Sequence, residues 1–331
     1  MTERRTDEGS SLWKRLLVYA VSLACLVWVF HDVHPRQLLA TMTISNWWYV
    51  ALAVLVDILT YVLQGARWSM LLSTVGPMGT LRATQGIYAG LFTNEVVPLR
   101  LGEVVRAFLA SRWLSCRFSA VLPSMVVERF LDAIWLVVGI GIAAILVPLP
   151  KNLVEAGDVL GVFVLLAGAL FLWIVLRKEK ELEHGESPAP AKGILGFISS
   201  LASGLREIGI SRNFYISALL SAGMLFCQAL AVWFMMLACG IRLPLQAGIV
   251  VTMIVRLGTA IPNAPANVGS FQFFTVVALG LFAVNKTTAA AFSIVDFVVL
   301  TAPLWILGLL AINRTGMSLA TIRTRVADLR G

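Results

Sequence analysis

Long apolar runs separated by short polar stretches dominate the chain. Between the second and third long runs, and again between the fifth and sixth, the pattern is interrupted by proline, glycine and charged residues. A bilayer-spanning helix takes roughly 20 apolar residues. The pattern therefore predicts six transmembrane helices and two segments of a different kind, with the helices at residues 12–30, 47–72, 119–147, 159–176, 213–239 and 287–312.

The first interrupted segment covers residues 81–112 and contains N-E-V-V-P-L-R-L-G-E-V-V-R at 94–106. Pro98 and Gly102 break helices, and four charged residues stand among apolar ones. Charges and unpaired backbone groups are costly in hydrocarbon, so they should face a polar cavity. We therefore expect a re-entrant hairpin of two half-helices, which enters and leaves the membrane on its inner side.

The second interrupted segment covers residues 243–284 and contains I-P-N-A-P-A-N-V-G-S-F-Q-F at 261–273. Pro265 and Gly269 repeat the proline-to-glycine spacing of the first segment. Broken segments at matching places in two halves of a transporter indicate a binding site at the repeat interface. The sequence thus predicts an all-α, polytopic membrane protein with an inverted repeat, in which the second hairpin opens outward.

The chain should form one integral membrane domain over residues 1–331. The link before the second span and residues 148–158 should be loops, the latter external, and the hydrophilic stretch after the fourth span should be a flexible cytoplasmic linker followed by an interfacial helix. The expected order is a disordered start at 1–11, a first half at 12–176, the linker at 177–212, a second half at 213–312 and a basic tail at 313–331.

Composition and charge support this topology. A chain that is 59% hydrophobic and 13% charged is no ordinary soluble domain. The loops assigned to the inside hold 19 of the 26 Lys and Arg residues, which predicts a multi-pass protein of the bacterial inner membrane with both termini in the cytoplasm. Nucleic acid is not an expected partner, because the basic residues are spread over several loops without a basic domain.

Neither a metal site nor a cofactor site is expected. No two cysteines form a C-x-x-C pair, and His31 and His34 fall in a predicted loop. Phosphate-binding and zinc-protease motifs are missing from the sequence. The cysteines should be small packing residues, and they are Cys25, Cys116, Cys227 and Cys239.

Four arginines in or beside the spans are candidates for binding an anionic group. Guanidinium is always charged and binds phosphate oxygens in a planar fork. The half-helices that begin near Gly102 and Gly269 should add free N–H groups at their positive ends. We therefore expect a phosphate near the middle of the membrane, unless the first two arginines extend to the inner surface. The candidates are Arg100, Arg106, Arg129 and Arg256.

Acidic residues occur inside the predicted spans as well. Glu128 and Asp132, in V-E-R-F-L-D, lie one helical turn apart. Intramembrane acids are usually paired or functional, so these two could neutralise arginines, relay protons, contact a cationic headgroup, or form a structural ion pair. Asp57 and Asp296 are candidates for proton or ion coupling, and Asp296 is expected to correspond to Asp132 in the repeat.

Polar side chains also follow the second break. They could bind headgroup oxygens, or they could satisfy backbone groups freed by the two prolines of this segment. They are Asn263, Asn267, Ser270 and Gln272.

Three of these motifs together resemble the transmembrane domain of lysylphosphatidylglycerol synthases and related flippase-like proteins: residues 98–106, 127–132 and 265–272. The resemblance covers nearly the whole chain and implies movement of a lipid with a polar or phosphate-linked headgroup between leaflets. Gln272 stands near the place where the family often has an acid. The soluble aminoacyltransferase domain of the full synthases is missing. Residues matching the family's charged motifs are Arg100, Glu103, Arg106, Glu128, Arg129 and Asp132.

We therefore expect an inner-membrane lipid flippase or scramblase rather than an enzyme, with a phospholipid, aminoacyl phospholipid, glycolipid or polyisoprenoid-linked lipid as its partner. One alternative is an intramembrane lipid-modifying enzyme with Glu103, Glu128 or Asp132 as general base. Another is a non-catalytic subunit of a lipid, hopanoid or glycolipid biosynthetic enzyme. A homo-oligomer and a biosynthetic enzyme partner are both compatible with the sequence.

Overall fold

The computed structural model describes residues 19–96, 101–183, 194–260 and 264–315, and within these ranges it consists of helices joined by short turns and links, without strands. Two short 3-10 turns accompany the α-helices. The elements are the helix Tyr19–Phe30, α2 (Pro35–Thr41), α3 (Trp47–Leu71), η1 (Leu72–Thr74), α4 (Thr80–Val96), α5 (Gly102–Trp113), α6 (Phe118–Leu146), α7 (Lys151–Glu183), α8 (Ile194–Ile208), α9 (Arg212–Ala238), α10 (Leu245–Thr259), η2 (Pro265–Asn267), α11 (Ser270–Gly280) and α12 (Lys286–Thr315).

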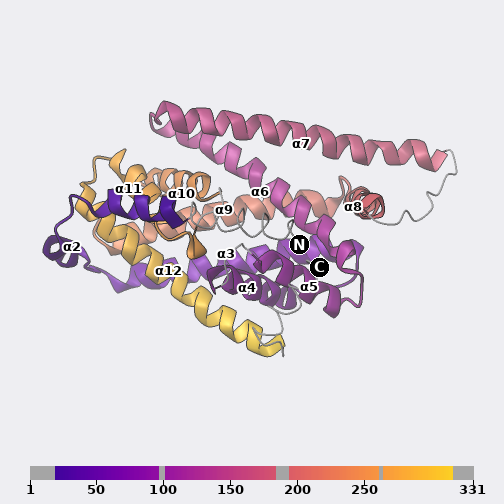
Figure 1. Cartoon of the computed structure of the whole chain (residues 1–331), viewed down its shortest axis with the longest axis horizontal. Helices are drawn as coiled ribbons and strands as arrows, with labels where there is room; N and C mark the ends of the chain where they lie inside the picture. Colours follow the sequence, from indigo (N-terminus) through magenta and orange to yellow (C-terminus); the bar gives the residue numbers. More distant parts are fainter. Residues whose placement is uncertain (1–18, 97–100, 184–193, 261–263, 316–331) are drawn as a thin grey trace, which may run out of the picture.

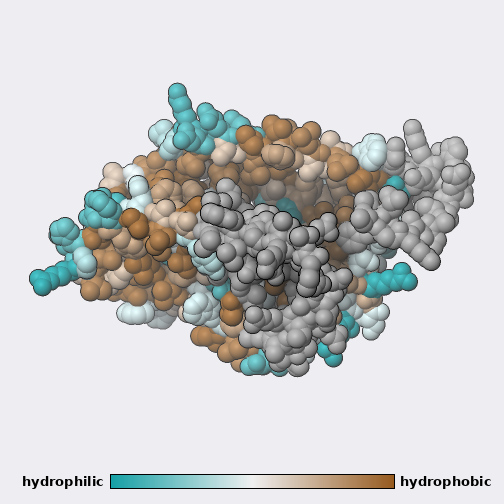
Figure 2. All heavy atoms as spheres, viewed as in Figure 1, coloured by the Kyte–Doolittle hydropathy of each residue, from teal (hydrophilic) through white to brown (hydrophobic). Residues whose placement is uncertain are grey.

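Five of the described helices, α3, α6, α7, α9 and α12, are long and apolar enough to cross a membrane. They correspond to five of the six predicted spans. The sixth, residues 12–30, is described only from Tyr19 onward, as a short apolar helix. Hydrophobic residues cover most of the described surface in Figure 2, while hydrophilic ones gather toward the ends of the molecule. The polytopic all-α fold is thereby confirmed.

Helix α7 corrects two predicted boundaries. It begins at Lys151, inside the predicted external loop 148–158, and it continues to Glu183, inside the predicted linker. Gly157 explains the early start, because it brings this end of α7 within van der Waals distance of Ile140 on α6. Packing against a neighbouring helix therefore outweighs the polar residues that suggested a loop. The predicted link before α3 likewise contains a helix, the short α2, which starts at a proline.

The two halves repeat the same order of long, short, short and long helices. Helices α3 to α6 begin at residues 47, 80, 102 and 118, and α9 to α12 begin 165 to 168 residues later. The first helices of the halves run antiparallel, because the amide of Ser45 just before α3 donates to the carbonyl of Ala238 at the end of α9 (2.7 Å). At the other end of the pair, Arg67 bonds to Ser221. Antiparallel equivalent helices agree with an inverted repeat.

Each predicted hairpin is a pair of short helices with an interruption between them. Helix α4 ends at Val96 and α5 begins at Gly102, the predicted break, while Pro98 lies outside the described residues. The two helices cross at Gly90 and Gly102, where a β-carbon on Gly90 would lie 2.7 Å from the carbonyl oxygen of Gly102. Two glycines are therefore needed for this approach.

The second pair is α10 and α11, which meet where Gly258 lies against the ring of Phe274. Helix α11 begins after Gly269, whose φ of 90° is a conformation that favours glycine. Pro265 falls in the 3-10 turn that precedes it. Separate helices thus stand on either side of both predicted breaks, whereas their re-entrant course in a membrane stays a prediction.

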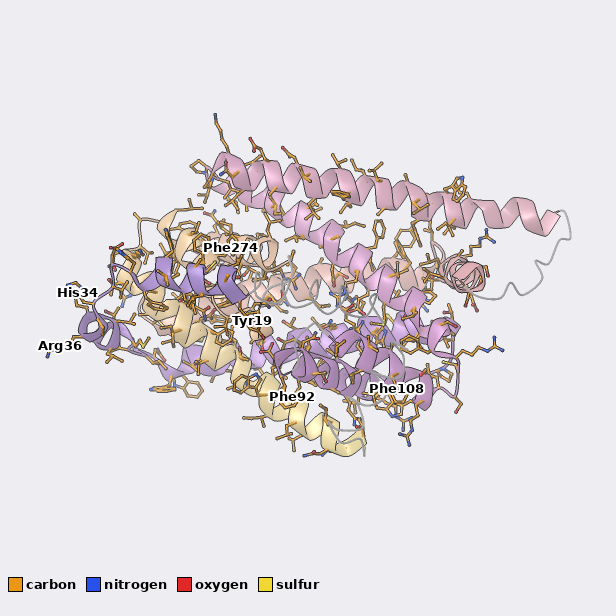
Figure 3. The ribbon with its side chains drawn as sticks, viewed as in Figure 1. Tyr19, His34, Arg36, Phe92, Phe108 and Phe274 are labelled. Atoms are coloured by element: carbon orange, nitrogen blue, oxygen red, sulfur yellow. The ribbon has the colours of Figure 1, made fainter. Side chains whose placement is uncertain are left out.

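Figure 1 shows how these elements are arranged along the molecule. Helices α10, α11 and α2 lie toward one end, and α4 and α5 lie nearer the middle of the long axis. Figure 3 places His34 and Arg36 at this end and Phe108 of α5 away from it. Helix α7 runs along one edge, and α8 is viewed end-on. The two helix pairs therefore follow one another along the long axis of the molecule.

Candidate functional site

Arg106 of α5 and Glu128 of α6 form the centre of a buried ion network. Nη1 and Nη2 of Arg106 donate to the two carboxylate oxygens of Glu128, at 3.0 and 2.7 Å. Arg106 is 4% exposed and Glu128 is fully buried. A two-pronged guanidinium–carboxylate pair is the strongest geometry for such a contact. The pair therefore fixes the first hairpin against α6.

Arg67 of α3 is the second cation of this network, and it has no exposed surface. Its Nη2 lies 2.9 Å from Oε1 of Glu128, and its Nη1 donates to Asp132 and to the hydroxyl of Ser221 on α9 (2.7 Å). Gln64, one turn earlier on α3, also donates to Glu128, at 3.1 Å. Four helices, α3, α5, α6 and α9, thus share one set of charged side chains.

An aromatic ring packs against the guanidinium of Arg106. The guanidinium of Arg106 lies over the ring of Trp68, 4.5 Å from its centroid. Trp68 is fully buried, and its indole nitrogen donates to Ser124 on α6 at 3.2 Å. A cation over an aromatic face is stabilised further where water is excluded. The position of Arg106 is therefore set on two sides.

The network reaches the surface through Arg129. Its side chain is 51% exposed and pairs with Glu103 at the start of α5, at 2.9 Å, and with Asp132 at 3.4 Å. Glu103 is 47% exposed and Asp132 is 23% exposed. Figure 2 shows the surface receding beneath α7, with a few hydrophilic atoms visible there between hydrophobic ones. The outer part of the network is thus accessible, unlike Glu128 and Arg67.

Arg256, in the last turn of α10, brings the second hairpin to the same cluster. It lies within electrostatic range of Asp132, Arg67 and Arg129. Within the described part of the chain its guanidinium forms no hydrogen bond or ion pair. The cluster thus contains four guanidinium groups and three carboxylates. The arginines are Arg67, Arg106, Arg129 and Arg256, and the acids are Glu103, Glu128 and Asp132. The cluster carries an excess of one positive charge.

The structure decides between the alternatives for Arg106. It is buried and paired, so the interpretation that it extends to the membrane surface is wrong. Glu128 has the role of an ion-pair partner that holds the hairpin against α6. Arg100 lies outside the described residues, so its place in the network stays a prediction.

One backbone amide at the start of each second half-helix is occupied by a side chain, and the expectation of free N–H groups stays a prediction for the other amides of the first turn. The amide of Gly102 donates to Oδ1 of Asn94 at 2.7 Å. The amide of Gly269 donates to Oε1 of Gln272, also at 2.7 Å. In both cases a side chain within the same hairpin caps the helix, because an unpaired amide would be costly in an apolar setting. Anion binding by these two amides is therefore not supported.

The polar residues after the second break are mostly used within the protein. The carbonyl oxygen of the Gln272 side chain caps α11, and the Ser270 side chain hydrogen-bonds to Cys25. Both residues are buried. Asn267 lies in η2 and is half-buried, while Asn263 is outside the described residues. Satisfaction of local groups thus accounts for Gln272 and Ser270 better than headgroup contact does.

Asp57 and Asp296 are buried, as expected of candidate coupling residues, but they lie apart from the ion network. The repeat also assigns Asp296 a different counterpart from the predicted one. Helix α6 begins at Phe118 and α12 at Lys286, so Asp296 occupies the position of Glu128 rather than that of Asp132. Asp132 and Asp296 are 164 residues apart, whereas Pro98 and Pro265 are 167 apart, and the helix starts agree with the longer distance.

Arg67 is the main functional candidate that sequence reasoning left out of the site. The available signal was a charged residue in the middle of an apolar span, three residues from Gln64. Trp68 and Ser221 carried no such signal, because nothing in the local pattern distinguishes them from packing residues. Among the described residues, no group of three His, Cys, Asp or Glu side chains could hold a metal ion.

Comparison with known proteins agrees with this architecture. A UPF0104 membrane protein of Methanothermobacter thermautotrophicus is 23% identical over 309 residues, covering 86% of this chain and 89% of that protein. Another, from Methanocaldococcus jannaschii, is 22% identical over 207 residues, covering 61% and 84%. The glycosyltransferase AglD of Haloferax volcanii is 23% identical over 362 residues, covering 95% of this chain but only 56% of that protein.

The family model for the lysylphosphatidylglycerol synthase transmembrane region matches residues 15–308. This range includes both helix pairs and every described residue of the ion network. The chain therefore belongs to the lysylphosphatidylglycerol synthase transmembrane-region family.

Proposed function

We propose that this protein moves a phosphate-bearing lipid headgroup across the membrane, as a flippase or scramblase rather than an enzyme. The observation that carries the proposal is the position of Arg256. This cation lies beside a charge-balanced network of three arginines and three acids, its guanidinium has no partner among the described residues, and it comes from the second hairpin. A guanidinium in such a place is suited to a phosphate oxygen.

The arrangement of the halves supports movement rather than static binding. The network joins α5 and α6 of the first half to α9 of the second through Arg67 and Ser221. Sites at the interface of inverted repeats are typical of transporters in which one half rocks against the other. A headgroup held between Arg256 and Arg129 would contact both halves, while its acyl or isoprenoid tails stay in lipid.

The same geometry argues against Glu128 as a general base. Both of its oxygens accept hydrogen bonds from Arg106, and one also accepts from Gln64. A base must be able to take a proton from its substrate, and a carboxylate held by two guanidinium groups is poorly disposed to do so. An intramembrane lipid-modifying reaction therefore finds less support than transport.

One relative favours a second candidate. AglD is named a glycosyltransferase, and 95% of this chain aligns with part of it. A membrane module that serves glycosyl transfer would handle a sugar attached to a lipid through phosphate. This second candidate function keeps the same headgroup chemistry. The protein would either transport a lipid that carries a phosphate-linked sugar, or act as a subunit beside a separate transferase.

The membrane orientation is part of the proposal. We place both termini on the cytoplasmic side of a bacterial inner membrane, because the predicted inner loops carry most of the Lys and Arg residues. Helix α8, seen end-on in Figure 1 while α7 is seen along its length, would then lie on the inner surface. Reporter fusions at each terminus, active only in the cytoplasm or only outside it, test this orientation.

Leaflet exchange in vesicles tests the transport proposal. The purified protein is reconstituted into liposomes that contain a phosphatidylglycerol with a fluorescent label on one acyl chain, and a membrane-impermeant reductant bleaches the outer leaflet. Bleaching beyond the outer-leaflet fraction reports exchange. Arg256→Gln should slow exchange about tenfold or more, because a charge-assisted hydrogen bond contributes about 1.5–3 kcal/mol and about 1.4 kcal/mol is tenfold.

Arg112→Gln is the matched control. Arg112 is an exposed arginine in the last turn of α5, outside the network. It should exchange lipid at the unchanged rate, and Arg256→Gln should keep its thermal stability because Arg256 forms no ion pair among the described residues. Exchange no faster than in protein-free vesicles, or equal exchange in both variants and the unchanged protein, contradicts the proposal.

A further inference from the structure

A second buried cluster, separate from the arginines, contains Asp57 of α3 and Asp296 of α12. Asp57 is 6% exposed and Asp296 is 1% exposed. Each has one carboxylate oxygen that finds no hydrogen-bond partner among the described residues. The two carboxyl groups lie within electrostatic range of each other. Helices α3 and α12 thus bring two buried acids together without a cation between them.

The contrast with Glu128 makes this pair unusual. Glu128 is equally buried, but two arginines compensate its charge. Neither Asp57 nor Asp296 forms an ion pair with any described residue. Transfer of an isolated carboxylate into a medium of low dielectric constant costs far more than a folded protein can offset, so such groups become neutral instead. Two neighbouring acids cannot both stay ionised at low cost.

A polar side chain next to the pair also lacks a partner. Tyr88 of α4 is 5% exposed, its hydroxyl has no hydrogen-bond partner among the described residues, and it lies within electrostatic range of Asp57. The other titratable groups in range are Tyr61, which faces Asp57, and Cys239, which faces Asp296. Unmade hydrogen bonds on three buried groups at one place indicate that an exchangeable species belongs there.

Helix α9 has a further open acceptor at the same level. The antiparallel pairing of α3 with α9, fixed by Ser45 with Ala238 and by Arg67 with Ser221, places Gln228 at the level of Asp57 along the two helices. The side-chain oxygen of Gln228 has no partner either. An acceptor here can take the hydrogen bond of a protonated carboxyl group. The chemistry of the cluster therefore suits a proton.

The cluster is linked to the arginine network along one helix. Asp57, Gln64 and Arg67 recur at helical spacing on the inner face of α3, and ten residues separate the first from the last, or about 15 Å. Tyr61 lies between them and is within electrostatic range of both Asp57 and Arg256. A displacement of α3 would therefore move residues of both the aspartate cluster and the arginine network.

We propose that Asp57 and Asp296 form a proton-binding site that holds one exchangeable proton between α3 and α12. Tyr88 donates a hydrogen bond to Asp57 when that carboxylate is ionised. The binding of the proton stands on the geometry of these residues alone. Its use to drive headgroup movement rests on the proposed transport function, through the shared helix α3.

A hydrophobic carbodiimide tests the site without any transport assay. Such reagents enter apolar surroundings and react with protonated carboxyl groups. The purified full chain in detergent is treated at neutral pH, and the modified residues are identified by peptide mass spectrometry. Asp57 or Asp296 should be labelled, and Glu128, which is buried but paired, should stay at background. Asp57→Asn and Asp296→Asn should each remove the label at the changed position.

Labelling should fall as the pH is raised, because deprotonation removes the reactive form. Unfolded protein, in which every carboxyl group is accessible, provides the reference for reactivity. No labelling at either aspartate in the folded protein, with labelling of both peptides after unfolding in acid, would overturn the proposal. Labelling of Glu128 to the same extent as the aspartates would also overturn it, since reaction would then follow burial rather than protonation.

An exchange assay in vesicles with a pH difference across the membrane distinguishes proton binding at the two aspartates from the coupling of that binding to lipid movement. If the proton drives exchange, the gradient should bias the labelled phospholipid toward one leaflet in the unchanged protein, and Asp57→Asn should abolish this bias. Carbodiimide labelling without any bias supports the proton site and contradicts coupling. Exchange without carbodiimide labelling contradicts the site and leaves the transport proposal standing.

Discussion

Glu128 and Asp296 occupy equivalent positions in the two halves, each ten residues after the first residue of its helix. Both are fully or almost fully buried. Glu128 is bonded to two arginines and a glutamine, whereas Asp296 has an oxygen without a partner among the described residues. One position of the repeat thus carries a fixed ion pair in the first half and an uncompensated acid in the second.

Removal of the Glu128 charge should strongly destabilise the protein. Glu128→Gln leaves the buried guanidinium groups of Arg67 and Arg106 without their shared carboxylate, and breaking a buried pair in this way costs about 3–5 kcal/mol. The midpoint of thermal unfolding in detergent should fall by many degrees. The double variant Arg106→Gln/Glu128→Gln should be more stable than Glu128→Gln alone. It removes the guanidinium of Arg106 together with the carboxylate that compensates it, so one buried charge fewer is left without a partner.

Glu103→Gln provides the comparison for this effect. Glu103 pairs with Arg129 in the same network, but both side chains are about half exposed. An exposed pair contributes only about 0–1 kcal/mol, so the unfolding midpoint should hardly change. Equal losses for Glu103→Gln and Glu128→Gln would show that burial does not govern the energetics of this network.

The crossing of α4 and α5 predicts a large effect of a single methyl group. Gly102→Ala puts a β-carbon into the space of the Gly90 carbonyl oxygen, so the two half-helices must move apart. Overpacking of this kind typically costs about 1–3 kcal/mol. It should also weaken the hydrogen bond from the Gly102 amide to Asn94, because the amide moves with the backbone. Thermal unfolding measures the loss.

Gly141→Ala tests whether the effect is specific to the crossing. Gly141 lies inside α6, and a β-carbon there would meet nothing within 4 Å. Alanine is the better helix former by about 1 kcal/mol, so this variant should be as stable as the unchanged protein or more so. A loss of stability at Gly141 equal to that at Gly102 would remove the steric explanation.

The fold was largely predictable because its signals are local. A span of apolar residues predicts a membrane helix by itself, and the breaks at Gly102 and Gly269 could be seen from glycine and proline alone. The start of α7 could not, since Lys151 and Asp158 read as loop residues until the contact of Gly157 with Ile140 is known. Long-range packing decided that boundary.

The site was predictable in its charges but not in their partners. Arginine inside an apolar chain indicates a functional or paired group, and Arg106 and Glu128 were both expected. Which carboxylate meets which guanidinium depends on how α3, α5 and α6 cross, and the sequence carries no record of this crossing. The role of Gln272 could not be predicted for a similar reason. An amide side chain can cap a helix or contact a lipid headgroup, and the sequence does not distinguish the two roles.

The end of the molecule near α2 should respond to acid. The pKa of Asp32 is lowered below its ordinary value by the hydrogen bond with His31 and by the hydrogen bond and charge of Lys286. A lowered carboxyl pKa means that the contact of Asp32 with Lys286 (3.1 Å) stabilises the fold at neutral pH and is lost as the pH falls through that pKa. Asp32→Asn should therefore lower the unfolding midpoint slightly at neutral pH, and the difference should vanish in acid. A difference that persists unchanged in acid would contradict the assignment.

The contact of the helix Tyr19–Phe30 with the second hairpin predicts a change in the reactivity of Cys25. Gly269 has a φ of 90°, and a β-carbon there would overlap the carbonyl oxygen of Ser22. Gly269→Ala should therefore strain the turn and push this helix away from α11. Cys25, which hydrogen-bonds to Ser270, is partly buried in the same contact. Its alkylation by a maleimide, followed by peptide mass spectrometry, should become faster.

Cys116 serves as the internal reference for that measurement, because it lies between α5 and α6 and belongs to neither element of this contact. Its rate should not change in Gly269→Ala. Gly280→Ala is the matched control, since a β-carbon at Gly280, at the other end of α11, meets nothing within 4 Å. Cys25 should react in this control as it does in the unchanged protein. If Cys25 and Cys116 accelerate together in Gly269→Ala, the variant has loosened the whole fold. The helix Tyr19–Phe30 would then not be held specifically by the glycine of the second break.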